Sequence, residues 1–208
     1  MLMERLTPRG NYVRTHAQIT SGARSVLMNW LVKAAADFQL NGETLSLAVS
    51  NVDRFLSTVI IRRSKLQLLG IASLLIAAKF EEVLPPEVPD LVAIAAGAYS
   101  KKELVRMERQ MLKHLYFDVA VPTTYYFLQR FAEVSRAADV AVYLGQYLCE
   151  LTFTEDDPYL QYLPSVVAGA ALCLANYTLD LHPWVINISF SSHDYELSFG
   201  RVLCYLPI

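Results

Sequence analysis

The charged residues that stand out in the sequence lie at the end of its most apolar segment. Lys79 follows the run Leu74–Ala78, and Phe80 and two glutamates come next. A lysine in the last turn of a helix can complement the helix dipole and cap free carbonyl groups. Alternatively, Lys79 and Phe80 are presented for a binding partner, with Glu108 as the nearby opposite charge if their two helices pack together. Both interpretations involve non-covalent contacts rather than a reaction.

A second pair of opposite charges lies in two other apolar segments. Arg24 and Asp53 can meet if these segments form neighbouring helices. A buried pair of this kind normally orients helices more than it adds stability. We therefore expect Arg24 and Asp53 to form a structural pair.

The sequence lacks the patterns of known catalytic, phosphate-binding and metal sites. Its four histidines lie in unrelated segments, with no HExxH motif and no nucleophile elbow. Cys149, Cys173 and Cys204 show no CxxC or Cys/His spacing for zinc, and three cysteines cannot all pair with one another. We expect a protein that is not an enzyme and that has no metal or cofactor, and we expect it in a reducing compartment.

The composition favours a folded protein without nucleic-acid or membrane partners. Hydrophobic residues make up 54% of the 208 residues and charged residues 18%, enough to bury a core. The net charge of −2 leaves no basic footprint for nucleic acid. The longest apolar stretches, 66–78 and 163–175, are too short to span a bilayer. The polar first ten residues give no secretory signal.

Apolar residues recur at helical spacing through the first half of the chain. This pattern predicts helices over 22–38, 43–56, 64–80, 87–96 and 101–115. The third of these is apolar on almost every side, so it belongs in the middle of a bundle. Ser100 and Glu103 form a capping-box signature at the start of the fifth helix.

A shift of 99 residues aligns the first half of the chain with the second. It places Gly70, Ala72 and Leu75 on Gly169, Ala171 and Leu174, and it predicts further helices over 121–137, 142–155 and 163–179. A fourth and a fifth helix, expected near 185 and 200, are replaced by the strand-like alternation of Ile186, Ile188 and Phe190.

We therefore predict an all-α fold with a complete first unit and an incomplete second one. The predicted parts are an N-terminal segment 1–21, a first unit 22–121, a second unit 122–184 and a divergent tail 185–208. Since two helices are missing from the second unit, we expect part of the apolar helix 164–177 to lie open and this unit to be loosely packed.

Several ordered motifs resemble the cyclin box. They run from Arg24-Ser-Val-Leu-Met-Asn-Trp30 and Asp53-Arg-Phe-Leu-Ser57 through Ala78-Lys-Phe-Glu-Glu82 to Arg106-Met-Glu108. Asp157-Pro-Tyr-Leu-Gln-Tyr-Leu-Pro-Ser165 is similar to the second box of A-type cyclins. The resemblance implies the cyclin fold, with a first five-helix box and an incomplete second one. It also implies regulation of a cyclin-dependent protein kinase in the nucleus or the cytoplasm.

The resemblance assigns two surfaces on the first box. The residues that match the family's kinase-binding site are Lys79, Phe80, Glu108, Leu112 and Phe117. The residues that match its docking patch for Arg-x-Leu-type motifs of substrates or inhibitors are Ala23, Val26, Leu27, Trp30, Lys33, Leu66 and Gln67. Core packing is the alternative role for the apolar members of this patch, Leu27 above all.

Departures from the family pattern leave alternatives open. Ala23 replaces a larger residue, and Lys33 stands where A-type cyclins carry an acidic residue, so we expect weakened docking. Most of the family's helix before the first box is expected to be absent. The chain is therefore either an activating subunit or a non-activating form that competes with longer cyclins. A DNA-binding module with the same fold is a third possibility, which the net charge disfavours.

Overall fold

The computed structural model describes residue 13 and residues 19–155 and 159–181 of the chain, and every regular element in them is helical. This confirms the predicted all-α class. The chain divides into two compact units, Met1–Val121 and Pro122–Ile208. The elements are α3 (Ser21–Asp37), α4 (Gly42–Leu56), η1 (Arg63–Lys65), α5 (Leu66–Glu81), α6 (Val88–Ala93), α7 (Lys101–His114), α8 (Thr124–Ser135), α9 (Asp139–Thr154), η2 (Tyr159–Gln161) and α10 (Pro164–Thr178).

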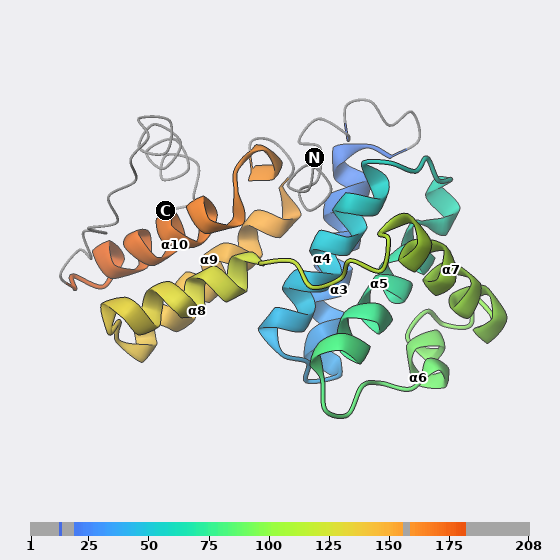
Figure 1. Ribbon diagram of the computed structural model, residues 1–208, viewed down its shortest axis with the longest axis horizontal. Coiled ribbons are helices and arrows are strands. Elements are labelled where there is room, and N and C mark those ends of the chain that lie inside the picture. The colour runs from blue at the N-terminus through green and yellow to red at the C-terminus, as the bar shows by residue number, and fades with distance from the viewer. Residues whose placement is uncertain (1–12, 14–18, 156–158, 182–208) are drawn as a thin grey trace. The chain divides into compact units, whose positions relative to one another are not determined.

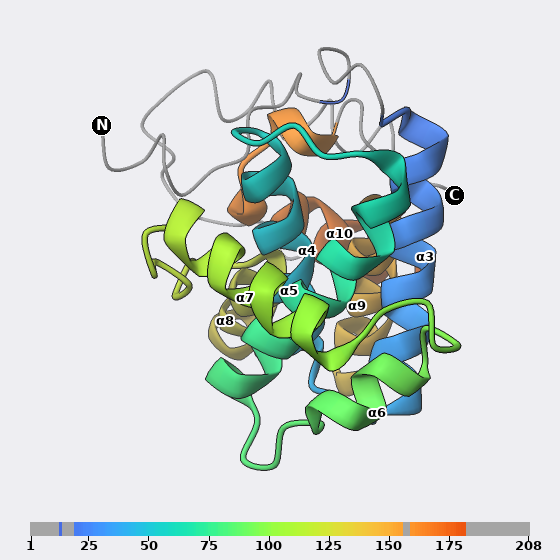
Figure 2. The ribbon, with the colours of Figure 1, turned by 90° about the vertical axis from the view of Figure 1, so that its right-hand side faces the viewer.

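Helix α5 forms the centre of the first unit. It is buried along almost its whole length up to Ala78, and α3, α4, α6 and α7 all pack against it (Figures 1 and 2). Its composition requires this position, because a helix without a polar side has no face for solvent. Gly70 allows α3 to come close, since a Cβ at this position would lie 2.8 Å from Cδ1 of Leu27. The predicted central helix thus positions the others.

The ends of the helices follow local signals in the sequence. The Ser100 hydroxyl accepts from the Glu103 backbone N–H, and the Glu103 carboxylate accepts from the Ser100 N–H, which confirms the predicted capping box. Helix α6 is shorter than the predicted 87–96, because Ala96 and Gly97 adopt left-handed backbone angles and end the helical run. Helix α8 ends at Ser135, and its C-cap residue Arg136 is left-handed as well.

The second unit is built from α8, α9 and α10, which pack on one another (Figure 1). The start of α9 at Asp139 is three residues earlier than predicted, and its carboxylate lies in the first turn, where the helix dipole favours it. In the part of the chain that the structure describes, no helix is long and apolar enough to cross a membrane. The predicted strand-like tail 185–208 lies outside the described residues.

The expected open apolar face on the last helix is wrong. Ten residues of α10 are buried, and Ala168, Ala170, Ala171 and Leu172 have no exposed surface. The small side chains let the neighbouring helices approach closely. A Cβ on Gly145 of α9 would lie 3.7 Å from Cα of Leu172 and 3.1 Å from Cδ1 of Leu128 on α8. Close approach therefore lets α8 and α9 cover the sides of α10 that face them.

Candidate functional site

The buried helix α5 reaches the surface in its last turn. Ala77 and Ala78 have no exposed surface, whereas Lys79, Phe80 and Glu81 are exposed. Exposure rises here because the chain leaves the helical bundle, and side chains that contact solvent are normally polar. One side chain breaks this rule, since the Phe80 ring keeps 53% of its surface in solvent. The end of α5 therefore combines a positive charge with an unburied aromatic ring.

Lys79 and Glu108 form an ion pair across two helices. The distance from Nζ of Lys79 to Oε1 of Glu108 is 2.7 Å, and the side chains are 48% and 13% exposed. Helices α5 and α7 pack together, which is the condition under which the sequence predicted this contact. A pair with one half-exposed member contributes roughly 0.2–1 kcal/mol to stability. Such a pair adds little to folding, yet it fixes both charges at the surface.

Apolar side chains follow Glu108 along α7 and the turn that ends it. Leu112 lies four residues after Glu108 on the same side of α7 and is half-buried, and Phe117 is 69% exposed. Phe117 and Tyr116 both adopt left-handed backbone angles, φ 57° and 56°, in the turn that ends α7. The N–H of Phe117 donates to the carbonyl of Leu112 at 2.8 Å and closes this turn. Residues other than glycine rarely adopt this conformation, and here it turns two aromatic rings outward.

Three further exposed apolar side chains near this site were not predicted from the sequence. Val83 and Leu84, directly after α5, are 94% and 89% exposed. Tyr116 is a third, at 69%. The signal that could have found the first two is Pro85-Pro86, which keeps the preceding residues extended and out of the bundle.

Two buried or half-buried charges hold the ends of these elements. Glu82 accepts hydrogen bonds from the Asn41 backbone N–H at 2.7 Å and from the Thr44 hydroxyl at 2.6 Å, which ties the end of α5 to the start of α4. Arg54 donates to the carbonyl of Asp118 at 2.9 Å and holds the chain just after Phe117. Burial lowers the pKa of Arg54, and the nearby Asp118 carboxylate opposes this shift.

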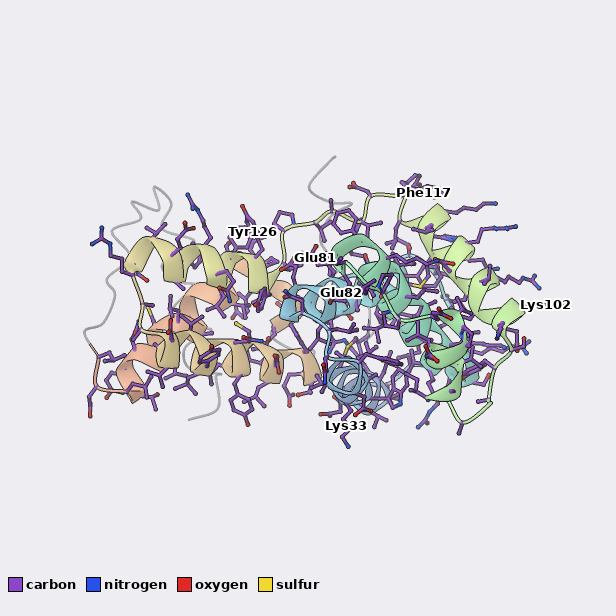
Figure 3. The ribbon with its side chains drawn as sticks, turned by 90° about the horizontal axis from the view of Figure 1, so that it is seen from below. Lys33, Glu81, Glu82, Lys102, Phe117 and Tyr126 are labelled. Atoms are coloured by element: carbon purple, nitrogen blue, oxygen red, sulfur yellow. The ribbon has the colours of Figure 1, made fainter. Side chains whose placement is uncertain are left out.

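Figure 3 places these residues in the first unit, with Glu81 and Glu82 at the end of α5 and Phe117 and Lys102 at opposite ends of α7. The structure thus brings Lys79 and Glu108 into direct contact. Phe80 and Leu112 are next to them along their helices, and Phe117 follows at the end of α7. Glu82 and Arg54 are positioning residues that sequence reasoning missed, because each depends on which backbone groups come within reach after folding.

The residues expected in the docking patch divide into two groups. Val26 is 71% exposed, Lys33 is exposed, and Trp30 and Gln67 are half-buried. Figure 3 shows Lys33 pointing away from the bundle. The other three, Ala23, Leu27 and Leu66, are no more than 7% exposed. These three buried residues belong to the core, which agrees with the alternative role considered for Leu27.

Arg24 and Asp53 lie together between α3 and α4. The Arg24 guanidinium donates to both carboxylate oxygens of Asp53, at 2.9 Å and 2.8 Å, and the side chains are 2% and 4% exposed. This bidentate geometry makes the hydrogen bonds between arginine and a carboxylate strong and specific. The pair lies in the core and is not accessible to a partner.

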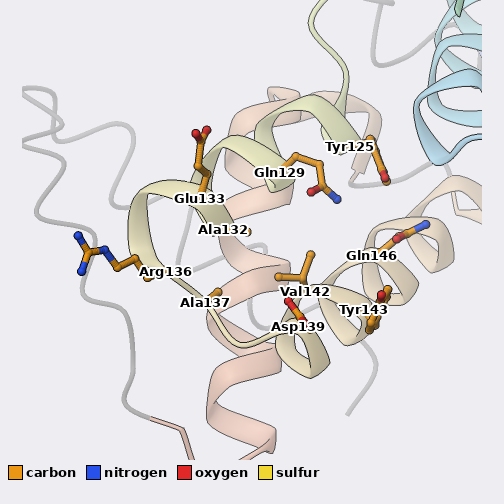
Figure 4. A pocket seen from close by; sticks show the side chains of 10 residues that line it. All are labelled: Tyr125, Gln129, Ala132, Glu133, Arg136, Ala137, Asp139, Val142, Tyr143 and Gln146. Atoms are coloured by element: carbon orange, nitrogen blue, oxygen red, sulfur yellow. The ribbon is translucent and has the colours of Figure 1, made fainter.

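The second unit contains a shallow groove between α8 and α9 (Figure 4). The residues that line it include Tyr125, Gln129, Glu133, Asp139, Val142 and Tyr143. Its charges are balanced, because Glu133 pairs with Arg130 at 2.7 Å and Arg136 lines the same groove. The groove therefore carries no clear preference for the charge of a ligand.

The described residues contain no group of three or more His, Cys, Asp or Glu side chains that could hold a metal ion. Cys149 is buried, and burial raises the pKa of its thiol far above the usual range. Burial also raises the pKa of the Cys173 thiol. Since the thiolate is the reactive form, neither cysteine is prepared to act as a nucleophile or ligand.

Comparisons with known proteins give consistent matches. A family model described as the N-terminal domain of cyclins matches residues 2–120, and one described as the C-terminal domain matches 122–198. The chain is 44% identical over 187 residues to a G2/mitotic-specific cyclin-A of Patella vulgata, covering 90% of this chain and 44% of that protein. It is 45% identical over 177 residues to cyclin-A1 of Homo sapiens, covering 85% and 38%. The chain thus spans less than half the length of either relative.

Two solved structures share the fold. A viral cyclin from herpesvirus saimiri matches with a TM-score of 0.80 and 20% identity over 99% of this chain and 95% of that one. A chain of the CAK complex from Chaetomium thermophilum, bound to ATP-gamma-S, matches with a TM-score of 0.61 and 17% identity, covering 98% of this chain and 67% of that chain. These likenesses concern the fold, and they confirm the one predicted from the sequence.

Proposed function

Because this chain belongs to the cyclin family, we propose that it is a regulatory subunit that binds a cyclin-dependent protein kinase and activates it in the cell cycle. Cyclins are regulatory subunits rather than enzymes, and the relatives at 44–45% identity are A-type cyclins. The proposed binding surface consists of Lys79, Phe80, Glu108, Leu112 and Phe117. It is called the α5–α7 surface below.

The observation that carries the proposal is the ion pair between Lys79 and Glu108 together with the exposed aromatic side chains at the ends of the same two helices. Phe80 and Phe117 keep more than half of their surface in solvent, at 53% and 69%. Aromatic side chains of this size are normally buried, and exposed clusters of them mark interaction sites. A partner that covers the rings would also desolvate the ion pair, which strengthens each of its hydrogen bonds.

Activation by such a subunit requires no chemistry from it. A kinase must form an ion pair between its own active-site lysine and a glutamate on a mobile helix. A protein that binds this helix only in its active position shifts the kinase population toward the active state. The α5–α7 surface offers two charges and several apolar groups for this purpose, held by the hydrogen bonds of Glu82 and Arg54.

The test is a titration of a purified, cyclin-free kinase of this class with the purified chain, with phosphate transfer to a protein substrate as the readout. We expect activity to rise from a low basal level and to saturate at a one-to-one ratio. A parallel titration adds the chain to a kinase that is already bound to a longer cyclin.

Loss of activity in the second titration without a gain in the first would overturn activation. It would instead identify the chain as a non-activating competitor, while the proposal that it binds the kinase would stand. Absence of any effect in both titrations, with no complex on size-exclusion chromatography, would contradict kinase binding as well.

A further inference from the structure

Helix α7 carries more positive charge than the proposed kinase site uses. It contains five Lys or Arg residues against two Glu, in a chain whose net charge is −2. The remainder of the chain is therefore net acidic. A concentration of cations on one helix of an acidic protein needs an explanation, because exposed like charges repel one another.

The cations lie on one side of the helix. At about 100° per residue, four of them fall within an arc of roughly 60°. This basic stripe consists of Lys102, Arg106, Arg109 and Lys113, all exposed. It points away from the bundle, because the buried residues Leu104, Met107 and Met111 lie on the opposite side. Figure 3 shows Lys102 directed into solvent.

Among the residues that the structure describes, none neutralises the stripe. The two glutamates of α7 are engaged elsewhere, Glu108 with Lys79 at 2.7 Å and Glu103 with Lys65 at 2.8 Å. Lys65 and the Ser100 cap hold the pKa of Glu103 at about 2, so its charge is committed to those contacts. None of the four stripe residues has an ion-pair partner among the described residues of the chain.

The dimensions of the stripe suit a short segment. Its ends lie eleven residue steps apart, which corresponds to roughly 16 Å at 1.5 Å per residue. An extended peptide covers this distance with about five residues at 3.3 Å each. We propose that the basic stripe is a docking surface for a short segment of a protein partner that is rich in aspartate and glutamate. Arginine is well suited to this role, since its guanidinium can bind a carboxylate through two parallel hydrogen bonds.

Two features disfavour nucleic acid as the ligand. No aromatic side chain lies between the cations on this face of α7, where the exposed neighbours are Val105 and Gln110, so successive bases along the stripe would have no ring to stack on. A nucleic acid also carries charge continuously along its length, and beyond the stripe it would meet a net acidic chain. A short acidic segment avoids this repulsion because it ends where the stripe ends.

The experiment measures fluorescence anisotropy of a labelled 12-residue peptide of Asp and Glu against the whole chain at 50 and 150 mM salt. We expect binding that weakens with salt. The double reversal Arg106→Glu/Arg109→Glu should weaken it at least tenfold. The matched control Arg62→Glu/Arg136→Glu makes the same change of net charge at two exposed arginines outside the stripe and should weaken it less than threefold.

The milder variant Lys102→Gln/Lys113→Gln keeps the test valid if the reversal disturbs folding, and we expect at least a threefold loss from it. Equal losses in the stripe and control variants would show that only net charge matters and would overturn the proposal. Tighter binding of a single-stranded oligonucleotide of twelve nucleotides than of the peptide would also overturn the proposal, and it would indicate a nucleic-acid-binding surface. The assay contains no kinase, so its outcome is independent of the proposed function.

Discussion

The carboxylate of Glu82 accepts a 2.6 Å hydrogen bond from the hydroxyl of Thr44 and so joins the end of α5 to the first turn of α4. The same oxygen accepts from the backbone N–H of Asn41, the N-cap residue of α4. A carboxylate at this place is favoured by the dipole of α4 and satisfies a backbone donor that the helix leaves free. The geometry of Lys79 and Phe80, one turn earlier, depends on this attachment.

Replacement of Glu82 by alanine should therefore lower both stability and kinase affinity. Loss of hydrogen bonds to a charged acceptor costs roughly 1.5–3 kcal/mol when buried, and about 1 kcal/mol is expected at this partly exposed position. The neighbouring Glu81→Ala is the matched control, because Glu81 is exposed at the same helix end. Urea denaturation and a kinase-binding isotherm measure the two effects. Equal stability and equal kinase affinity of the two variants would contradict a positioning role of Glu82.

Removal of one member of the buried pair of Arg24 and Asp53 should lower the free energy of unfolding strongly. Asp53→Ala leaves a guanidinium that is 2% exposed without this acceptor, and the expected loss is about 3–5 kcal/mol. The exposed pair of Arg130 and Glu133, at 58% and 72% exposure, serves as a comparison, with an expected loss below about 1 kcal/mol for Glu133→Ala. Similar midpoints of urea unfolding for the two variants would contradict a structural role of the Arg24–Asp53 pair.

Asn51 on α4 is a buried amide whose Nδ2 and Oδ1 have no hydrogen-bond partner among the residues that the structure describes. An unsatisfied buried polar group costs roughly 1–3 kcal/mol. Asn51→Leu, which keeps the branched shape and the number of side-chain heavy atoms, should thus raise the free energy of unfolding by about 1 kcal/mol. Thermal or urea unfolding measures this change in stability, and Ser50→Leu at the half-buried preceding position serves as the control. A loss of stability in Asn51→Leu would show that the amide is satisfied in solution.

The proposed docking patch should bind Arg-x-Leu-type peptides weakly because of Lys33. This exposed ammonium group would repel the arginine of such a peptide. The change Lys33→Glu converts repulsion into attraction and should improve affinity by roughly 0.2–1 kcal/mol or somewhat more, most clearly at low salt. Peptide titrations by calorimetry test this, and Arg62→Glu provides the same charge change elsewhere. An unchanged affinity in Lys33→Glu would place the peptide outside this patch.

The sequence predicted the helices well where their periodicity was strong. The central position of α5 followed from its lack of a polar side, and the start of α7 followed from Ser100 and Glu103. The approach of Lys79 to Glu108 was conditional on helix packing, which the sequence could not fix. The left-handed turn at Tyr116 and Phe117 had no signal, because neither residue type favours it.

The error on α10 has a physical cause as well. Counting missing helices assumed that a buried helix always needs the same number of neighbours. Small residues change the packing, since Ala168, Ala170 and Ala171 let α8 and α9 approach α10 closely on the sides that face them. Contacts of Glu82 and Arg54 could not be predicted, because their partners are backbone or hydroxyl groups far away in sequence.

The central claim, that the α5–α7 surface binds a kinase, is tested most directly by the affinity of a purified cyclin-dependent kinase for Lys79→Ala. Its matched control is Lys65→Ala, because Lys65 forms a similar ion pair with Glu103 at the other end of α7. Truncation of one member of a charged pair that becomes buried at an interface costs about 2–5 kcal/mol. We predict that Lys79→Ala weakens binding at least tenfold while Lys65→Ala changes it less than threefold, with both variants equally helical. Equal affinities of Lys79→Ala and the unmodified chain would contradict the account.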